Sequence, residues 1–114
     1  MNRELTITPA DGPAAGQRVL HLEGPVVLET LFKFRDALKQ ETATKVILDF
    51  TQVPYIDSAG LGSIVGAFVR YRDAGRGLAL AGMNAKCKAL LQMTNLESTF
   101  RTFSTLEEAL KQPL

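Results

Sequence analysis

Hydrophobic and polar residues alternate in two segments near the start of the chain. Residues Arg3–Thr8 place Leu5 and Ile7 on one face, and Arg18–Glu23 follow the same two-residue period. The stretch between them, residues 9–17, is rich in proline, glycine and alanine. Two alternating segments joined by turn-forming residues are typical of a β-hairpin, so we expect two adjacent strands here.

The remainder of the chain alternates between helical spacing and short apolar runs. The first helical stretch repeats apolar residues at three- and four-residue steps, which predicts one buried stripe. The stripe comprises Leu28, Leu31, either Phe34 or Arg35, and Leu38. The predicted helices are Leu28–Gln40, Ala59–Ala74, Ala85–Thr94 and a short segment ending at Lys111. The predicted strands are Lys45–Phe50, Leu78–Gly82 and Phe100–Phe103.

Several polar residues mark where these helices begin and end. Asn84 is a good N-cap for the third helix, and Asn95 stands where a left-handed residue closes it. Ser104 and Glu107 have the spacing of a capping box for the last helix. Together these elements predict an α/β sandwich over residues 1–114. We expect a mixed four- to five-stranded sheet that begins with a hairpin, with about four helices mostly on one side.

The composition of the chain argues against several classes of function. The net charge is +1 and the basic residues are scattered, so nucleic acid is not an expected partner. Apolar runs are too short for membrane insertion, and the first residues carry no secretory signal. With one histidine, His21, and one cysteine, Cys87, we expect no metal site, and no motif indicates a cofactor. A soluble cytoplasmic domain is predicted.

The most unusual segment begins the second helix. Asp57 and Ser58 open it, and Gly60, Gly62 and Gly66 follow, although each interior glycine costs about 1 kcal/mol relative to alanine. One interpretation is that Asp57 or Ser58 simply caps the helix. The other is that Ser58 accepts a phosphate on a surface that glycines keep low for a partner. The residues alone leave both open.

Catalysis by Ser58 has little support in the sequence. Ile56 replaces the first glycine of a G-x-S-x-G nucleophile elbow. The only histidine, His21, alternates with Leu20 and Leu22 on a predicted strand and should point to the opposite face. Cys87 lies on an apolar helix face, which favours burial. We therefore predict that the chain is not an enzyme, with a serine hydrolase as the weakest alternative.

The segment VILDFTQVPYIDSAGLG resembles the central signature of STAS domains, and the resemblance extends over essentially the whole chain. It implies that Ser58 is the phosphate acceptor and that Asp57 is its neighbour on a kinase-facing surface. Further residues match the signature and are implied to bind the partner: Ala59, Gly60, Leu61 and Gly62.

The resemblance also implies a function, that of an anti-sigma factor antagonist. Such a protein binds an anti-sigma factor that is also a serine kinase, and so frees a sigma factor. Phosphorylation of Ser58 would end the binding, and a PP2C-type phosphatase would restore it. We expect a monomer or a weak dimer.

One position departs from that pattern. Val27 occupies the place of an aspartate that often follows the second strand in members that bind such kinases. We expect Val26, Val27 and Tyr55 to form an apolar contact patch instead. The departure favours an alternative, an interaction module that is not phosphorylated. Such a module would be a scaffold or the cytoplasmic subunit of an ABC-type lipid transporter.

Overall fold

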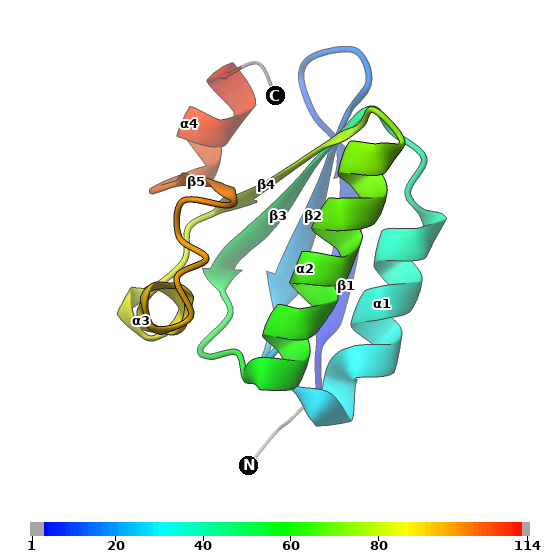
Figure 1. Cartoon of the computed structure of the whole chain (residues 1–114). Helices are drawn as coiled ribbons and strands as arrows, with labels where there is room; N and C mark the ends of the chain where they lie inside the picture. The colour runs from blue at the N-terminus through cyan, green and yellow to red at the C-terminus, as the bar shows by residue number, and fades with distance from the viewer. Residues whose placement is uncertain (1–3, 113–114) are drawn as a thin grey trace.

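The computed structural model of the protein describes residues 4–112. Its centre is a five-stranded sheet in the order β1-β2-β3-β4-β5, in which β1 runs antiparallel to β2 and all other neighbours are parallel (Figure 1). The strands are β1 (Thr6–Asp11), β2 (Gln17–Glu23), β3 (Lys45–Gln52), β4 (Gly77–Ala81) and β5 (Arg101–Phe103). The helices are the 3₁₀ turn η1 (Leu28–Thr30), α1 (Leu31–Gln40), α2 (Ser58–Asp73), α3 (Ala85–Met93) and α4 (Leu106–Lys111).

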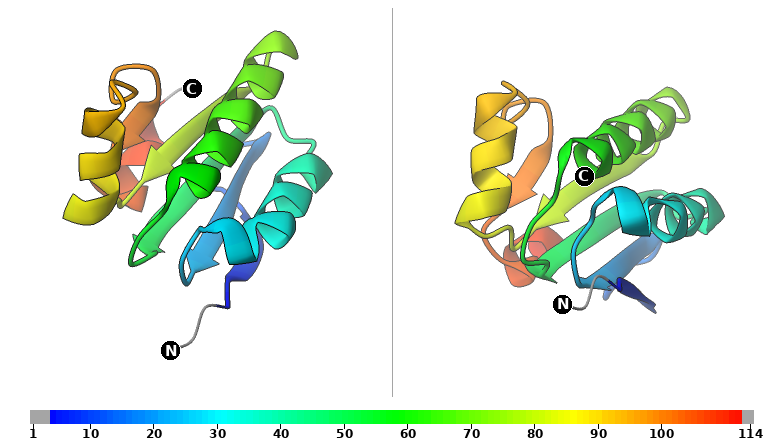
Figure 2. Two further views of the ribbon diagram at one scale, coloured as in Figure 1. Left: turned by 60° about the horizontal axis from the view of Figure 1, so that its bottom comes forward. Right: turned by 90° about the horizontal axis from the view of Figure 1, so that it is seen from below.

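Helices cover the two faces of the sheet unequally (Figure 2). α1, α2 and α3 enclose the main core, while α4 packs on the other face. There Ala109 contacts a small cluster formed by Val19, Ile47, Ala79 and Ala81. The predicted α/β fold, with its hairpin and mixed sheet, is confirmed. Within residues 4–112, no helix has the length and apolar character needed to cross a membrane.

The unbroken apolar run of β3 follows from its place between the two helical layers. Val46, Leu48 and Phe50 face the main core, and Ile47 faces α4. All four are fully buried. A central strand covered on both faces has no polar side to present, so the alternation seen in β1 and β2 disappears.

The first strand lies further along the chain than its pattern predicts. It covers Thr6–Asp11 rather than Arg3–Thr8, and Arg3 lies outside the described residues. Its register with β2 continues to the pair Asp11–Arg18, so it includes Pro9. An edge strand tolerates proline because only one of its sides must donate hydrogen bonds to a neighbour.

The first helix also begins differently. Residues Leu28–Thr30 form a 3₁₀ turn, and the Thr30 hydroxyl donates to the Pro25 carbonyl oxygen at 2.8 Å and accepts from the Val27 amide at 3.0 Å. This places buried Thr30 inward and leaves Leu28 65% exposed. The prediction that Leu28 belongs to the buried stripe is therefore wrong, while Phe34 and Leu38 are buried as expected.

The caps are largely as predicted. The Asn84 side chain accepts from the Cys87 amide at 2.9 Å, and Asn95 adopts a left-handed conformation with φ of 58°. The last capping box is shifted by one residue. Thr105, not Ser104, accepts from the amide of Glu108 and pairs with its carboxylate.

Gly60 has an internal packing role. A β-carbon at this position would collide with the carbonyl oxygen of Val26, in the segment that precedes η1. The expectation that Gly60 keeps an outer surface low is therefore wrong. By contrast, a β-carbon at Gly62 would meet no atom within 4 Å, so nothing in the described chain requires glycine there.

The two glycines give a matched pair of substitutions in α2. We expect Gly60→Ala to lower the free energy of unfolding by about 1–3 kcal/mol, because α2 must move away from Val26. Gly62→Ala should raise it by up to about 1 kcal/mol, because alanine has the higher helix propensity. Urea denaturation followed by circular dichroism measures both. Equal effects of the two changes would contradict the packing role of Gly60.

Candidate functional site

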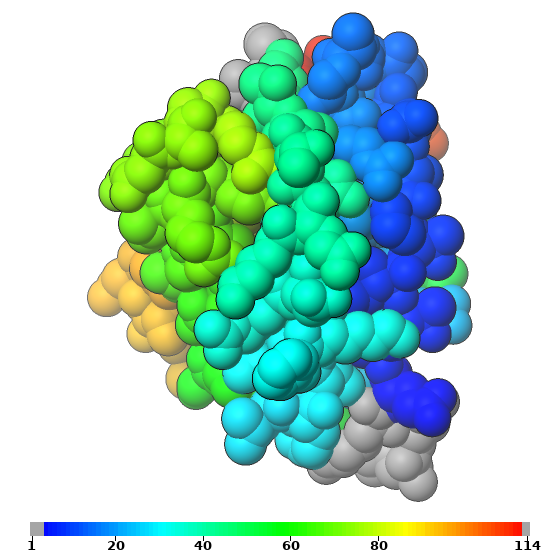
Figure 3. Space-filling view, turned by 90° about the vertical axis from the view of Figure 1, so that its right-hand side faces the viewer, coloured from blue at the N-terminus to red at the C-terminus, as the bar shows by residue number. Residues whose placement is uncertain are grey.

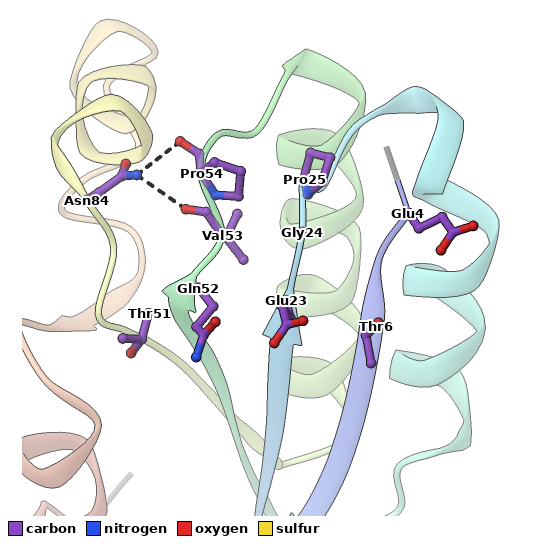
Figure 4. A pocket seen from close by; sticks show the side chains of 10 residues that line it. All are labelled: Glu4, Thr6, Glu23, Gly24, Pro25, Thr51, Gln52, Val53, Pro54 and Asn84. Carbon is purple, nitrogen blue, oxygen red and sulfur yellow. Dashed lines mark hydrogen bonds between the residues drawn. The ribbon is translucent and has the colours of Figure 1, made fainter. Parts of the chain in front are cut away.

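The central strands β2 and β3 separate just beyond their carboxyl ends, where a cavity of about 470 Å³ opens between the loops (Figure 4). The last hydrogen bond before this gap runs from the amide of Gly24 to the carbonyl of Gln52, at 3.1 Å. Pro25 and Pro54 follow, and neither has an N–H to donate across the gap. The Asn84 side chain holds one wall by donating to the Pro54 carbonyl oxygen at 3.0 Å. The separation is thus a consequence of the two prolines.

Beyond the gap the two loops meet again at a single bridge between Val26 and Ile56. The Asp57 amide then donates to the Val26 carbonyl oxygen at 3.3 Å. Because Val26 shortly precedes η1 and Ile56 shortly precedes α2, the bridge sets the N-termini of both helical segments side by side (Figure 1).

Asp57 joins these two N-termini through its carboxylate. One oxygen, Oδ1, accepts from the Gly60 amide at 2.8 Å and caps α2. The other, Oδ2, accepts from the Leu28 amide at 3.0 Å, in the first residue of η1. Helix N-termini present free N–H groups and positive dipole ends, so a carboxylate shared by two of them is well satisfied.

Ser58 is the first residue of α2, and it is exposed. Since Asp57 provides the cap, the Ser58 hydroxyl is not needed for that task. The hydroxyl has no hydrogen-bond partner within residues 4–112. Of the two interpretations of this pair, capping therefore accounts for Asp57 but leaves the exposed serine without a structural role.

The other predicted partner-binding residues divide by burial. Ser58 and Gly62 are exposed, and Asp57, Ala59 and Tyr55 are half-buried. Four more are buried: Val26, Val27, Gly60 and Leu61. The prediction of an apolar contact patch at Val26 and Val27 is wrong, because both side chains pack into the core beneath the Val26–Ile56 bridge.

Two exposed apolar residues were missed. Phe32 is 91% exposed and Leu28 is 65% exposed, at the start of α1 and in η1. Spacing gave no signal for this exposure, because Phe32 stands four residues from Leu28 and so fits the helical period of the predicted buried stripe.

The backbone amides at the start of η1 find hydrogen-bond acceptors although position 27 carries valine and not aspartate. The Val27 side chain is buried, with 2% of its surface exposed. Its amide donates to Thr30 Oγ1 at 3.0 Å, and the following amide, of Leu28, is taken by Asp57. The N–H groups at the start of η1 thus find acceptors in Thr30 and Asp57.

His21 lies on the sheet face opposite to α2, as its alternation with Leu20 and Leu22 predicts. Its Nδ1 lies 2.8 Å from Asp49 Oδ2 on the neighbouring strand. The other Asp49 oxygen accepts from the amide and hydroxyl of Thr51. A histidine across the sheet cannot serve Ser58 as a base, so the hydrolase alternative lacks the group it requires.

Comparison with known proteins identifies one domain family over most of the chain. A family model described as the STAS domain matches residues 8–109. The anti-sigma-B factor antagonist of Listeria monocytogenes is 32% identical over 80 residues, which cover 68% of this chain and 70% of that protein. Rat prestin is 40% identical over 65 residues, which cover 54% of this chain but only 9% of prestin.

Solved structures share the fold over nearly the full length. A putative anti-sigma factor antagonist from Thermotoga maritima superposes with a TM-score of 0.83 at 24% identity, covering 92% of each chain. The unphosphorylated form of the anti-sigma factor antagonist SpoIIAA gives 0.73 at 19% identity, over 92% of this chain and 93% of that one. At these identities the likeness shows the fold alone.

The hydrogen bonds around Asp49 give stability a pH dependence. Burial raises the pKa of Asp49, but hydrogen bonds from Thr51 and His21 lower it more, so it lies below its ordinary value of 3.8. A lowered pKa stabilises the fold above 3.8, and this stabilisation is lost as the pH falls through the folded-state pKa.

We therefore expect the stability advantage of the wild type over Asp49→Asn to shrink as the pH falls from about 6 to about 2. Thermal unfolding at a series of pH values measures it. Asp73→Asn serves as the control, because Asp73 forms only an exposed pair with Arg72 at 3.6 Å. A difference in stability between the wild type and Asp49→Asn that stays constant with pH would contradict a lowered pKa of Asp49.

Proposed function

Because the chain belongs to the STAS domain family, we propose that it is an anti-sigma factor antagonist controlled by phosphorylation of Ser58. The unphosphorylated chain binds an anti-sigma factor that is also a serine kinase, and a sigma factor is released. Phosphate on Ser58 ends this binding, and a PP2C-type phosphatase restores it. The chain acts in the cytoplasm as a non-catalytic switch.

The observation that carries the proposal is the exposed hydroxyl of Ser58 at the start of α2. It has no hydrogen-bond partner in the described chain, and Asp57 already caps the helix. A kinase can therefore reach the hydroxyl without unfolding any part of the domain. The positive end of the α2 dipole also favours negative charge on this residue.

The charges at the site explain how a phosphate would act. It adds a charge of about −2 next to the Asp57 carboxylate. The Gly60 amide, which a phosphate could otherwise bind, is already taken by Asp57 Oδ1. The added charge therefore remains at the surface, where it opposes docking by repulsion and by its cost of desolvation. The effect falls on the partner and needs no change of fold.

The name of one relative, and the phosphorylated state in which another was solved, support the proposal. The Listeria relative is named an anti-sigma-B factor antagonist, and SpoIIAA of Bacillus has been solved in a phosphorylated form. The alternative, an interaction module that is never phosphorylated, draws on Val27 in place of an aspartate. Val27 is buried, so its side chain places neither a carboxylate nor an apolar contact at the surface beside Ser58.

Intact-mass spectrometry tests the switch. The wild type and Ser58→Ala are incubated with ATP and each anti-sigma-type serine kinase encoded by the source genome. We expect one phosphate on the wild type and none on the variant. The phosphorylated chain should then bind the same kinase at least about tenfold more weakly, as measured by calorimetry.

A control variant for the same assay is Ser63→Ala, which removes another α2 hydroxyl and should leave phosphorylation unchanged. Phosphate on Ser58→Ala would place the acceptor elsewhere. A folded wild type that gains no phosphate from any of the kinases would favour the unphosphorylated interaction module.

A further inference from the structure

The loop of residues 53–57 carries the chain from β3 to Ser58. At its level β2 and β3 have parted, and the cavity of about 470 Å³ lies between them (Figure 4). The loop therefore runs along this opening without a neighbouring strand until the bridge that precedes α2. Three consecutive carbonyl oxygens in it, those of Val53, Pro54 and Tyr55, accept hydrogen bonds from groups outside the loop. These hydrogen bonds help to set the path by which the chain reaches α2.

The segment before η1 holds one side of this loop. The Val26 amide donates to the Tyr55 carbonyl oxygen at 3.2 Å, and the Asp57 amide donates to the Val26 carbonyl oxygen at 3.3 Å. On this side α1 packs directly beside α2, as the space-filling view shows (Figure 3). The end of the loop nearest Ser58 is thus joined to the first two helical segments.

The side chain of Asn84, the residue before α3, holds the opposite side of the loop (Figure 4). Its Nδ2 donates to the Pro54 carbonyl oxygen at 3.0 Å and to the Val53 carbonyl oxygen at 3.3 Å. Its Oδ1 accepts from the Cys87 amide at 2.9 Å and so caps α3. One side-chain amide therefore serves a helix N-terminus with its oxygen and the loop with its nitrogen.

The cap alone does not require asparagine at position 84. Aspartate and serine cap helices about as well, but only an amide combines the capping oxygen with a nitrogen that donates to two carbonyls. The donated hydrogen bonds bear on Ser58 because phosphoryl transfer depends on geometry. The attacking hydroxyl must lie about 3–3.5 Å from phosphorus and in line with the leaving oxygen, and a displacement of about 1 Å lowers the rate steeply.

We propose that Asn84 is a positioning residue for the phosphorylation of Ser58. Its amide nitrogen fixes the loop against α3, so that the Ser58 hydroxyl is presented in one place to the phosphoryl donor of a kinase. This inference rests on the function proposed above. It adds to the site a residue that borders α3, a helix that contains none of the partner-binding residues predicted from the sequence.

The hold on the loop is tested in the chain alone, by amide hydrogen exchange in Asn84→Asp. Aspartate keeps an oxygen for the Cys87 amide but turns an oxygen, not an N–H group, toward the two loop carbonyls. We expect exchange about tenfold faster at the amides of Val26 and Asp57, and no change at Cys87. Unchanged exchange at Val26 and Asp57 overturns the inference. Faster exchange at all three amides would show that α3 loosens as a whole, and would overturn a separate role for the amide nitrogen.

The positioning role is tested by kcat and KM with the serine kinase that phosphorylates the wild type. Asn84→Asp and Asn84→Ser should each lower kcat at least about fivefold and change KM less than about twofold. Asn84→Ser adds no charge, so a loss common to both variants does not come from a new carboxylate. Thr105→Ala is the matched control, because it removes a cap from α4 on the other face of the sheet and should leave both constants unchanged.

The outcomes separate this inference from the switch itself. Equal kinetics of the wild type and both Asn84 variants overturn the positioning role and leave the switch standing. A higher KM at unchanged kcat would show that the loop serves binding alone, and an equal loss in Thr105→Ala would assign the effect to lower stability. Either result overturns the positioning role. If no kinase phosphorylates the wild type, the proposed function and this inference fail together.

Discussion

One carboxylate bonds the N-termini of two helical segments in this protein, and the geometry of the candidate site depends on it. Asp57 accepts from Gly60 in α2 and from Leu28 in η1. Backbone N–H groups at helix N-termini need acceptors, and here a single side chain supplies both. The two segments that follow β2 and β3 are therefore fixed to each other at the point where Ser58 is exposed.

The route to that arrangement begins in the sheet. Parallel strands end at one edge, so the loops after β2 and β3 emerge together. Pro25 and Pro54 then break the pairing, and the Val26–Ile56 bridge restores it one step before Asp57. Gly60 completes the approach, because a β-carbon there would strike the Val26 carbonyl oxygen. The glycine that seemed to serve an outer surface is thus required by an internal contact.

The opposite face of the sheet has a different character. There α4 covers the small cluster around Ala109, and beside it Asp49 binds both His21 and Thr51. These polar groups are mutually satisfied and join neighbouring strands. The division places the exposed serine on the helical side of the sheet and the histidine on the other.

The sequence by itself determined the α/β class, most helix and strand positions, the caps at Asn84 and Asn95, and the match of the Asp57–Ser58 segment to a family pattern. These features depend on local periodicity and on single-residue preferences, which the chain carries without reference to distant parts. Only the tertiary structure decided which neighbours of Ser58 reach the surface. Val26 and Val27 are buried because a bridge to Ile56 draws them under the helices, and Leu28 is exposed because Thr30 turns inward. The Val26–Ile56 bridge joins residues about thirty positions apart, and no local pattern specifies it. The Thr30–Pro25 hydrogen bond is local, but it interrupts the helical spacing on which the prediction for Leu28 rested.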